Sequence, residues 1–420
     1  MSAEAEPTLL PGPVAEAHRQ PNQDWRVLLG VFWVTSMVEG LGVSQIFAFL
    51  PAYLREMGVP EAERLPFVGL LSSLIFVVGM PLVPLWGVWA DKYSRKVVIT
   101  RSAIVEAVVL AAVALSREPW QLAASLLLIG LQLGNTGVML GAIRDSAPVH
   151  RLGTALAVFG ASGPIGFAVG PVLGGFIVDG LGWGLPAVFA VSAGLSVATA
   201  LLVAVGSREV RPPVIPQGRS LELAFGAVRG VLADPSVRRI FAIFGTAFLA
   251  QQIARPYVPV LVERINGPIG EASAIGLVAG TAALAGALIA PVGGPLGDRI
   301  GFRPVLIGAL LGAGILFALL PAAPTVPALA AIALVFSALY GVVSPMVFGL
   351  LATEVPVERR SQTLNLVYLP LYLAGVIGPT LGALVVSAGA AAPFLLGGAV
   401  FIAGSLAVAR QPRPAVAAPD

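Results

Sequence analysis

Apolar runs of about 20 residues recur along almost the whole chain, separated only by short polar stretches. A helix of that length crosses the hydrocarbon core of a bilayer. Of the 420 residues, 57% are hydrophobic and 11% charged, whereas a soluble domain carries roughly a quarter charged residues. The runs also lack the strict alternation of barrel strands. The sequence therefore predicts an all-α membrane protein that crosses the bilayer many times.

Hydropathy divides the chain into twelve predicted transmembrane helices. We place them at residues 27–53, 66–89, 97–116, 120–143, 153–178, 184–205, 238–262, 274–296, 304–322, 326–351, 362–388 and 392–409. If the N-terminal tail is cytoplasmic, the loops after the even-numbered helices hold most of the basic residues: Lys92, Arg95, Lys96, Arg144, Arg151, Arg299, Arg303, Arg359 and Arg360. The other loops hold Arg55, Arg64, Arg117 and Arg264. Because Lys and Arg concentrate in cytoplasmic loops, we expect a multi-pass protein of the inner (plasma) membrane with both termini inside.

Polar segments divide these helices into two sets. Residues 1–24 contain acids and prolines but no apolar core, so we expect a cytoplasmic tail and no signal peptide. Residues 207–237 are rich in proline and arginine and read as a cytoplasmic linker, within which SLELAFGAVRGVL predicts a short amphipathic helix on the inner leaflet. The predicted domains are therefore an N-terminal six-helix bundle at 25–206, a C-terminal one at 238–410, and a cytoplasmic tail at 411–420.

The two halves repeat each other at an offset of 207 or 208 positions. The matching landmarks are Pro51 with Pro259, Pro84 with Pro291, Asp91 with Asp298, Pro148 and Arg151 with Pro356 and Arg359, and Gly170-Pro171 with Gly378-Pro379. Apolar helices that are alike only by chance would not keep one register over five landmarks. A parallel repeat of two pseudo-symmetric six-helix bundles predicts a transporter that works by alternating access, with its site between the halves.

One charged motif occurs once in each half. The stretch GVWADKYSRK contains Gly87, Asp91, Lys92, Arg95 and Lys96, and its copy GPLGDRIGFR contains Gly294, Asp298, Arg299 and Arg303. This doubled motif resembles the loop after helix 2 in the major facilitator superfamily: glycine, three residues, aspartate, a base, then a small residue and further bases. The resemblance covers about residues 25–410, although Ser94 stands where the family has glycine.

The spacing of the motif has a physical reason. Gly87 and Asp91 lie one turn apart on one helix face, so the glycine admits a neighbouring helix where the carboxylate sits. Asp91 is expected at the C-terminal end of its helix, where the macrodipole disfavours a negative charge, so it needs a partner. The resemblance implies that this partner is a helix N-terminus of the opposite half in the outward-open state, which makes the motif a conformational latch. The alternative is a basic turn that only sets the topology.

The fifth predicted helix contains a second family motif. Its residues Gly166, Gly170, Pro171, Gly174 and Gly175 lie in GFAVGPVLGG. This pattern resembles the helix-5 signature of exporters that exchange substrate for protons, in the twelve-helix multidrug:proton antiporter group. The alternative is that the glycines only allow close helix packing. These antiporters usually carry an arginine in helix 4, where this chain has Gly130, so proton coupling must rest on other residues or be absent.

Two carboxyl groups lie at membrane depth and are candidates for proton coupling. Glu39 lies about 12 residues into the first predicted helix, which places it near mid-membrane. A carboxyl there can bind and release a proton as the hydration of a cavity changes; alternatively it stays protonated and hydrogen-bonded to a neighbouring helix. Glu106, in the third predicted helix, is also deep, and for it the alternative is a structural ion pair with Arg101 or a neighbouring helix.

The remaining polar residues of the spans suggest a mainly apolar substrate cavity. They are Gln45 and Phe47 of helix 1, Gln251, Gln252 and Arg255 of helix 7, and the stripe Asn365, Tyr368 and Tyr372 of helix 11. Such a lining suits lipophilic or amphiphilic compounds, although aromatic stripes also serve packing alone. Arg255 has three interpretations: it holds an anionic substrate, forms an outer gate with a carboxylate, or extends its charge outward to water.

Other functional classes find no support in the residues. The chain has no cysteine, and its two histidines, His18 and His150, lie in a tail and a loop. No nucleophile–base pair, metal cluster or phosphate loop appears, so we expect neither catalysis nor a cofactor or metal. The basic residues form no nucleic-acid patch. We therefore expect a monomeric, proton-coupled exporter of lipophilic or amphiphilic small molecules; the alternative is an exporter or importer of a specific small, anionic metabolite.

Overall fold

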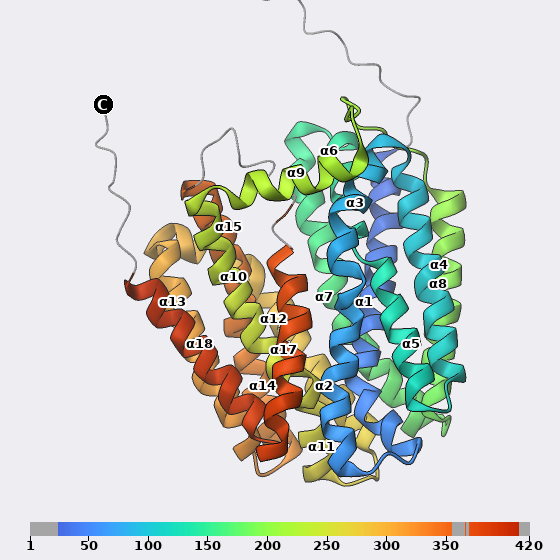
Figure 1. Ribbon diagram of the computed structural model, residues 1–420, viewed down its shortest axis with the longest axis vertical. Helices are drawn as coiled ribbons and strands as arrows, with labels where there is room; N and C mark the ends of the chain where they lie inside the picture. The colour runs from blue at the N-terminus through green and yellow to red at the C-terminus, as the bar shows by residue number, and fades with distance from the viewer. Residues whose placement is uncertain (1–23, 355–365, 367–368, 411–420) are drawn as a thin grey trace, which may run out of the picture.

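The computed structural model describes residues 24–354, 366 and 369–410, and within these ranges all regular secondary structure is helical (Figure 1). Its first half contains α1 (Trp25–Glu56), α2 (Glu61–Val77), α3 (Gly79–Lys92), α4 (Arg95–Leu115), α5 (Pro119–Ile129), η1 (Gly130–Gln132), α6 (Asn135–Ser146), η2 (Val149–Arg151), α7 (Leu152–Gly175), η3 (Phe176–Gly180) and α8 (Leu185–Gly206). A linking helix, α9 (Ser220–Leu232), covers the stretch in which the sequence predicts a short helix.

The second half follows the same order of long helices. It contains α10 (Pro235–Ala254), η4 (Arg255–Tyr257), α11 (Val258–Asn266), α12 (Glu271–Ile300), α13 (Phe302–Leu319), η5 (Leu320–Ala322), α14 (Val326–Gly341), α15 (Val343–Glu354), α17 (Leu369–Val385), η6 (Val386–Ala388) and α18 (Ala392–Arg410).

In the described part of the chain, 11 helical segments are long and apolar enough to cross a membrane. The predicted helix that is not among them is the seventh, residues 238–262. That segment is divided between α10, η4 and α11, and it carries Arg238, Arg239 and Arg255. The all-α membrane fold is thereby confirmed, while the count of twelve crossings stays a prediction.

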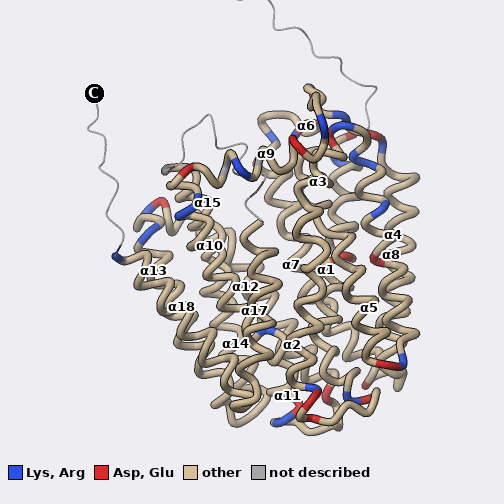
Figure 2. Tube along the Cα trace, viewed as in Figure 1, with Lys and Arg blue, Asp and Glu red and all other residues tan. Residues whose placement is uncertain are grey.

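The helices of the two halves lie side by side (Figure 1). In the first half, α1 packs on α7 and α8, and α4 packs on α8; in the second, α10 packs on α17 and α18, and α12 on α14. The main contacts between the halves are α7 with α12 and α2 with α17. We call the end that holds Trp25 and α9 the linker end, and the end that holds the turn between α1 and α2 the opposite end. Charged residues gather at these two ends, and few lie between them (Figure 2).

Two helices of the first half are broken at the same level. The fourth predicted span is interrupted between α5 and α6, where Gly134 has a φ of 98°, a value that favours glycine. The second span is interrupted between α2 and α3, and a methyl group at Gly130 would lie 2.6 Å from the backbone nitrogen of Gly79. The two breaks therefore approach each other closely enough for backbone contact, with the Leu133 side chain packed against Gly79. The break in the fourth span places Asn135, the first residue of α6, beside α1.

Candidate functional site

Glu39 lies inside the first half and is joined to the helix break. Its side chain is on α1 and only 7% exposed. The side-chain amide of Asn135 donates a hydrogen bond to its carboxylate. Ser102 and Arg101 of α4 lie close enough to interact with the same carboxyl group. Glu39 therefore has polar neighbours from both α4 and α6 in an otherwise apolar interior.

Glu106 is a second buried carboxyl beside the first. Its side chain on α4 is fully buried, and neither carboxyl oxygen makes a hydrogen bond of ordinary geometry among the described residues, although Ser196 and Gln132 lie close enough to interact with it. A methyl group at Gly42 of α1 would lie 2.6 Å from Glu106 Oε1, so the carboxyl sits directly against the backbone of α1. Glu39 is close enough to act on it electrostatically. Glu39 and Glu106, which we call the carboxyl pair, thus share one region between α1 and α4.

Arg101 does not form the ion pair with Glu106 that the sequence left open. Its guanidinium lies 3.6 Å from the centre of the Trp86 ring. The three guanidinium nitrogens are buried and have no hydrogen-bond partner among the described residues. A cation over the face of an indole is attracted by the ring quadrupole, so Trp86 holds Arg101 away from Glu106.

Arg255 lies between the two halves. It belongs to η4 of the second half, and its guanidinium carbon lies 4.5 Å from the ring centre of Phe47 and 4.9 Å from that of Phe167, both in the first half. Its Nη1 donates a 3.4 Å hydrogen bond to the Gln252 side chain, and Tyr340 is near enough to interact with it. Arg255 is partly exposed. Among the described residues no carboxylate pairs with it, so the structure contains no outer gate of that kind.

The other predicted cavity residues have different surroundings. Gln45 is fully buried within the first half, where it donates to the carbonyl of Gly170 at 3.1 Å and accepts from the Ser192 hydroxyl. Its amide therefore joins α1, α7 and α8. Tyr372 contacts Phe76 across the halves with ring centres 6.5 Å apart, and Gln251 is partly exposed beside Arg255. Asn365 and Tyr368 lie outside the described residues.

The helix-5 glycines pack α7 tightly against α1. A methyl group at Gly166 would lie 2.0 Å from the carbonyl oxygen of Met37, and one at Gly170 would lie 2.6 Å from that of Leu41. At Gly174 the methyl group would meet the Phe49 ring at 2.2 Å. These three glycines are one turn apart on one helix face, so α7 and α1 approach to backbone contact.

The Gly-Pro residues of each half contact a glycine of the other half. A methyl group at Gly276 of α12 would lie 2.8 Å from the carbonyl oxygen of Pro171. A methyl group at Gly69 of α2 would lie 2.5 Å from the carbonyl oxygen of Pro379. The two glycines are themselves related by the sequence offset of the repeat, as are the two prolines. The two contacts between the halves are therefore equivalent: each joins the Gly-Pro motif of one half to the same repeat position, a glycine, in the other half.

Ion pairs that were not predicted from the sequence join the halves at the opposite end. The pairs are Arg55–Glu263 at 2.8 Å, Arg55–Glu271 at 2.5 Å, Arg64–Glu263 at 2.9 Å and Arg264–Glu61 at 3.0 Å. The sequence did contain a signal for one of them. Arg55 and Glu263 occupy equivalent positions of the repeat, which carry Arg-Glu in the first half and Glu-Arg in the second. Opposite charges at equivalent positions can pair across a pseudo-symmetric interface.

Sequence comparison identifies the family. The profile of the Major Facilitator Superfamily matches residues 32–272 and 240–420. The chain belongs to the major facilitator superfamily. Among curated members, "Multidrug resistance protein MdtG" of Citrobacter koseri is 30% identical over 293 residues, which are 69% of this chain and 70% of that protein. MdtG of Klebsiella pneumoniae is 29% identical over 293 residues, 69% of each chain. The protein is thus a multi-pass membrane transporter that resembles multidrug:proton antiporters.

Solved structures show the same superfamily fold. The bacterial homologue of the human lysosomal transporter Spinster, in an inward-facing and occupied conformation, superposes with a TM-score of 0.73 at 14% identity and covers 93% of this chain and 96% of its own. The nucleoside transporter NupG (D323A mutant) gives a TM-score of 0.71 at 16% identity, covering 91% of this chain and 98% of its own. At these identities the likeness concerns the fold alone.

The first copy of the superfamily latch motif is paired within its own half. Arg95 is only 3% exposed and bridges Asp91 and Asp145, each at 2.8 Å. Glu209 accepts hydrogen bonds from the Ser94 hydroxyl and from the backbone nitrogen of Arg95. Lys96 donates to the carbonyl of Ser207 at 2.8 Å, and Lys92 to that of Gly218 at 2.6 Å. The charges of this copy are therefore satisfied without the second half.

Two charged residues of the second copy, Asp298 and Arg299, make no polar contact with the opposite half among the described residues. Asp298 and Arg299 are exposed and make no ion pair among the described residues, while Arg303 donates to the carbonyl of Val408 at 2.8 Å. A methyl group at Gly87 or at Gly294 would meet nothing within 4 Å. Among the described residues, neither Asp91 nor Asp298 therefore pairs with the opposite half, and the latch that the superfamily resemblance implies stays a prediction.

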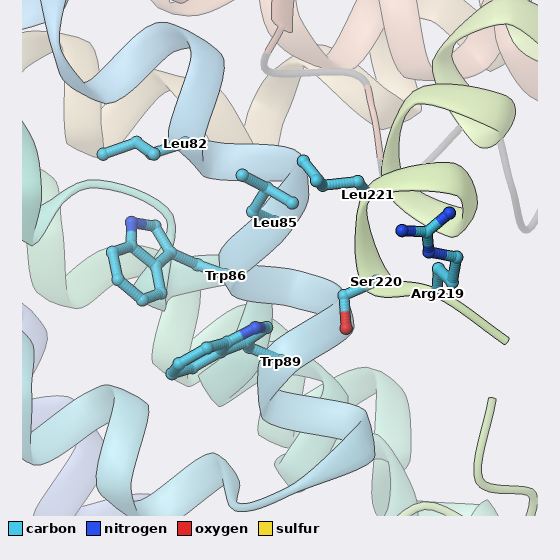
Figure 3. A pocket seen from close by; sticks show the side chains of 7 residues that line it. All are labelled: Leu82, Leu85, Trp86, Trp89, Arg219, Ser220 and Leu221. Atoms are coloured by element: carbon cyan, nitrogen blue, oxygen red, sulfur yellow. The ribbon is translucent and has the colours of Figure 1, made fainter. Parts of the chain in front are cut away.

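A groove of about 430 Å³ separates α3 from the start of the linker helix (Figure 3). It is lined by Leu82, Leu85, Trp86 and Trp89 of α3 and by Arg219, Ser220 and Leu221 of the linker. Trp86 thus lines this groove and also stacks on Arg101. The linker helix therefore rests on the helix that carries the first latch motif.

Proposed function

We propose that this superfamily member exports lipophilic or amphiphilic small molecules in exchange for protons. The observation that carries the proposal is the carboxyl pair, Glu39 and Glu106, buried in an apolar interior beside a broken helix. Two carboxylates this close in a low dielectric repel each other when both are ionised, so the pair is suited to hold protons. Asn135 at the start of α6 links Glu39 to a helix break, where a small backbone movement changes the surroundings of the carboxyl.

The transporter works by alternating access of two six-helix bundles, residues 25–206 and 238–410, that together cross the membrane twelve times. The linker end faces the cytoplasm, as the excess of basic loops there favours. The conformation described above is then inward-open. In support, four ion pairs close the opposite end, whereas among the described residues Asp91 and Asp298 at the linker end make no ion pair with the other half. Glu39 gives up its proton to the cytoplasm in this state.

The class of substrate follows from the lining residues and the relatives. Phe167, Tyr340 and Tyr372 are partly exposed and offer aromatic surface beside the buried Phe47, with few hydrogen-bonding groups. The relatives with 29% and 30% identity are named multidrug resistance proteins. A second candidate function, transport of a specific small anionic metabolite, is favoured only by the charge of Arg255.

The test is uphill transport of a fluorescent lipophilic dye into inverted membrane vesicles under an imposed proton gradient. Glu39→Gln keeps the size and hydrogen bonding of the side chain but cannot bind and release a proton. We expect this variant to lose gradient-driven accumulation while it still equilibrates dye down a concentration gradient. Saturable flux would distinguish the carrier from a channel, which would carry ohmic current.

The matched control is Glu63→Gln, which removes an exposed carboxyl of α2 outside the pair. It should accumulate dye like the wild type. Full gradient-driven accumulation by Glu39→Gln would remove Glu39 from the coupling mechanism. A wild-type protein that moves no dye under any gradient would refute multidrug export itself.

A further inference from the structure

Arg255 is a cation placed where the two halves meet. It lies in η4, the short turn that divides α10 from α11, and so interrupts the seventh predicted span. Its guanidinium reaches across to Phe47 of α1 and Phe167 of α7. A charged residue within a predicted membrane span is costly and is a candidate for a functional site by default.

The described residues provide no anion for this charge. Glu263 and Glu271 at the opposite end pair with Arg55, and Glu263 also pairs with Arg64. The carboxyl pair lies inside the first half, against the backbone of α1 and near Arg101. Arg255 itself is held by two aromatic rings and by one long hydrogen bond to Gln252. Its positive charge is therefore not neutralised by any carboxylate in the described part of the chain.

The surroundings of Arg255 define the chemistry of a partner. A guanidinium has five N–H donors in a planar fork that fits the two oxygens of a carboxylate or sulfonate. Only one hydrogen bond from this fork is present among the described residues, and part of the side chain is exposed. Of the two adjacent rings, Phe47 is buried, whereas Phe167 is partly exposed and offers an apolar surface on which an aromatic body can stack. An anionic group attached to a flat apolar body satisfies both features at once.

We propose that Arg255 binds the anionic group of the substrate and that the transported compounds are amphiphilic organic anions with a flat apolar body. This inference rests on the proposed function, because it places Arg255 in the substrate pathway between the halves. It narrows the substrate class from lipophilic compounds in general to those with one carboxylate or sulfonate. Phe47 and Phe167 position the guanidinium, and the partly exposed Phe167 faces the apolar part of the ligand.

The test measures binding to the purified protein, which needs no proton gradient. The probes are 2-naphthoate, 2-naphthamide and 2-naphthylmethylammonium, which share one ring system and differ in charge. Isothermal titration calorimetry should show that the wild type binds 2-naphthoate at least about tenfold more tightly than 2-naphthamide. The reason is that the carboxylate of the naphthoate accepts charge-assisted hydrogen bonds from Arg255. Arg255→Gln should lose this preference, and Arg255→Lys should keep part of it. Arg229→Gln, an exposed arginine of the linker helix, is the matched control.

Two results would overturn the assignment. One is equal binding of naphthoate and naphthamide by the wild type; the other is an Arg255→Gln variant that binds both more weakly by the same factor, as a structural role would require. If Arg255→Gln does not fold, Gln251→Cys in this cysteine-free chain gives a second measurement. Naphthoate, but not naphthamide, should protect that thiol from alkylation, and a lack of protection contradicts the proposal. If Arg255 does not bind the anionic group, gradient-driven dye transport is still observed. That result therefore differs from failure of the proposed function, in which no dye is transported.

Discussion

Replacing Gly276 with alanine should force the opposite end of the molecule to open. The new methyl group would lie 2.8 Å from the carbonyl oxygen of Pro171 and 3.2 Å from both the Pro171 carbonyl carbon and the Val172 Cα. All three are backbone atoms, so no side-chain rotation relieves the contact. Helices α12 and α7 must move apart by about half an ångström to restore ordinary van der Waals distances.

The size of the effect follows from the cost of that movement. Overpacking a close helix contact costs about 1–3 kcal/mol. In the conformation with the opposite end open, α12 and α7 separate at this level and the methyl group is accommodated. The equilibrium between the two conformations should therefore shift toward the open one by a factor of about 5 to 150.

Distances between spin labels can measure this shift. The chain contains no cysteine, so labels can be attached at Glu63→Cys in the first half and Ile269→Cys in the second without background. Both positions are exposed at the opposite end, and Ile269 is 90% exposed. Double electron–electron resonance should give one short label-to-label distance in the parent protein. In the Gly276→Ala variant, a larger share of the molecules should show a longer distance.

A control and a related variant sharpen the result. Gly160→Ala adds a methyl group to α7 at a position with nothing within 4 Å, so it should leave the distances unchanged. Gly69→Ala, whose methyl group would lie 2.5 Å from the Pro379 carbonyl oxygen, should act in the same direction as Gly276→Ala. An unchanged distance distribution in both contact variants would refute the view that these glycines hold the halves together.

Two further predictions concern charges at the two ends. Asp91→Asn should lower the initial transport rate in proteoliposomes by at least about tenfold, because the latch loses its charge, while the amount inserted in the membrane stays the same; wild-type rates would exclude the latch. Glu263→Gln removes the partner of Arg64, whose side chain is only 6% exposed, so the closed opposite end should be destabilised by on the order of 1 kcal/mol or more. The spin-label distances should lengthen, and identical distances would show that these ion pairs do not hold the end closed.

The helices were predictable because their cause is local. A run of about 20 apolar residues can satisfy its backbone in lipid only as a helix, so hydropathy predicts most spans. The first predicted helix, residues 27–53, lies inside α1, and the sixth, residues 184–205, differs from α8 by one residue at each end. The interruption near Gly134 was harder to predict, because the left-handed conformation depends on how α5 and α6 pack. Its sequence, GLQLGN, nevertheless has glycines and amides unusual for a lipid-facing helix.

The partners of buried charges were not predictable, because the third dimension decides them. Arg101 is close in sequence to Glu106, yet its guanidinium stacks on Trp86 of another helix. Gln45 has the polarity expected of a cavity residue, but Gly170 and Ser192 occupy its amide. Sequence spacing fixes which face of a helix a residue occupies; it does not fix which helix that face meets.

The arrangement of charges would allow one chain to hold two conformations of similar free energy, as the proposed alternating access requires. Arg95 bridges Asp91 and Asp145 within the first half, so opening the latch leaves no buried charge without a partner. At the opposite end, Arg55 is 36% exposed, so water can replace part of its ion pairs when that end opens. When either end opens, its charged side chains therefore still have a partner, which is a neighbouring side chain at the linker end and water at the opposite end. A substrate or a proton then needs only a modest difference in affinity between the two states to move the equilibrium, which is the condition for a transporter that cycles.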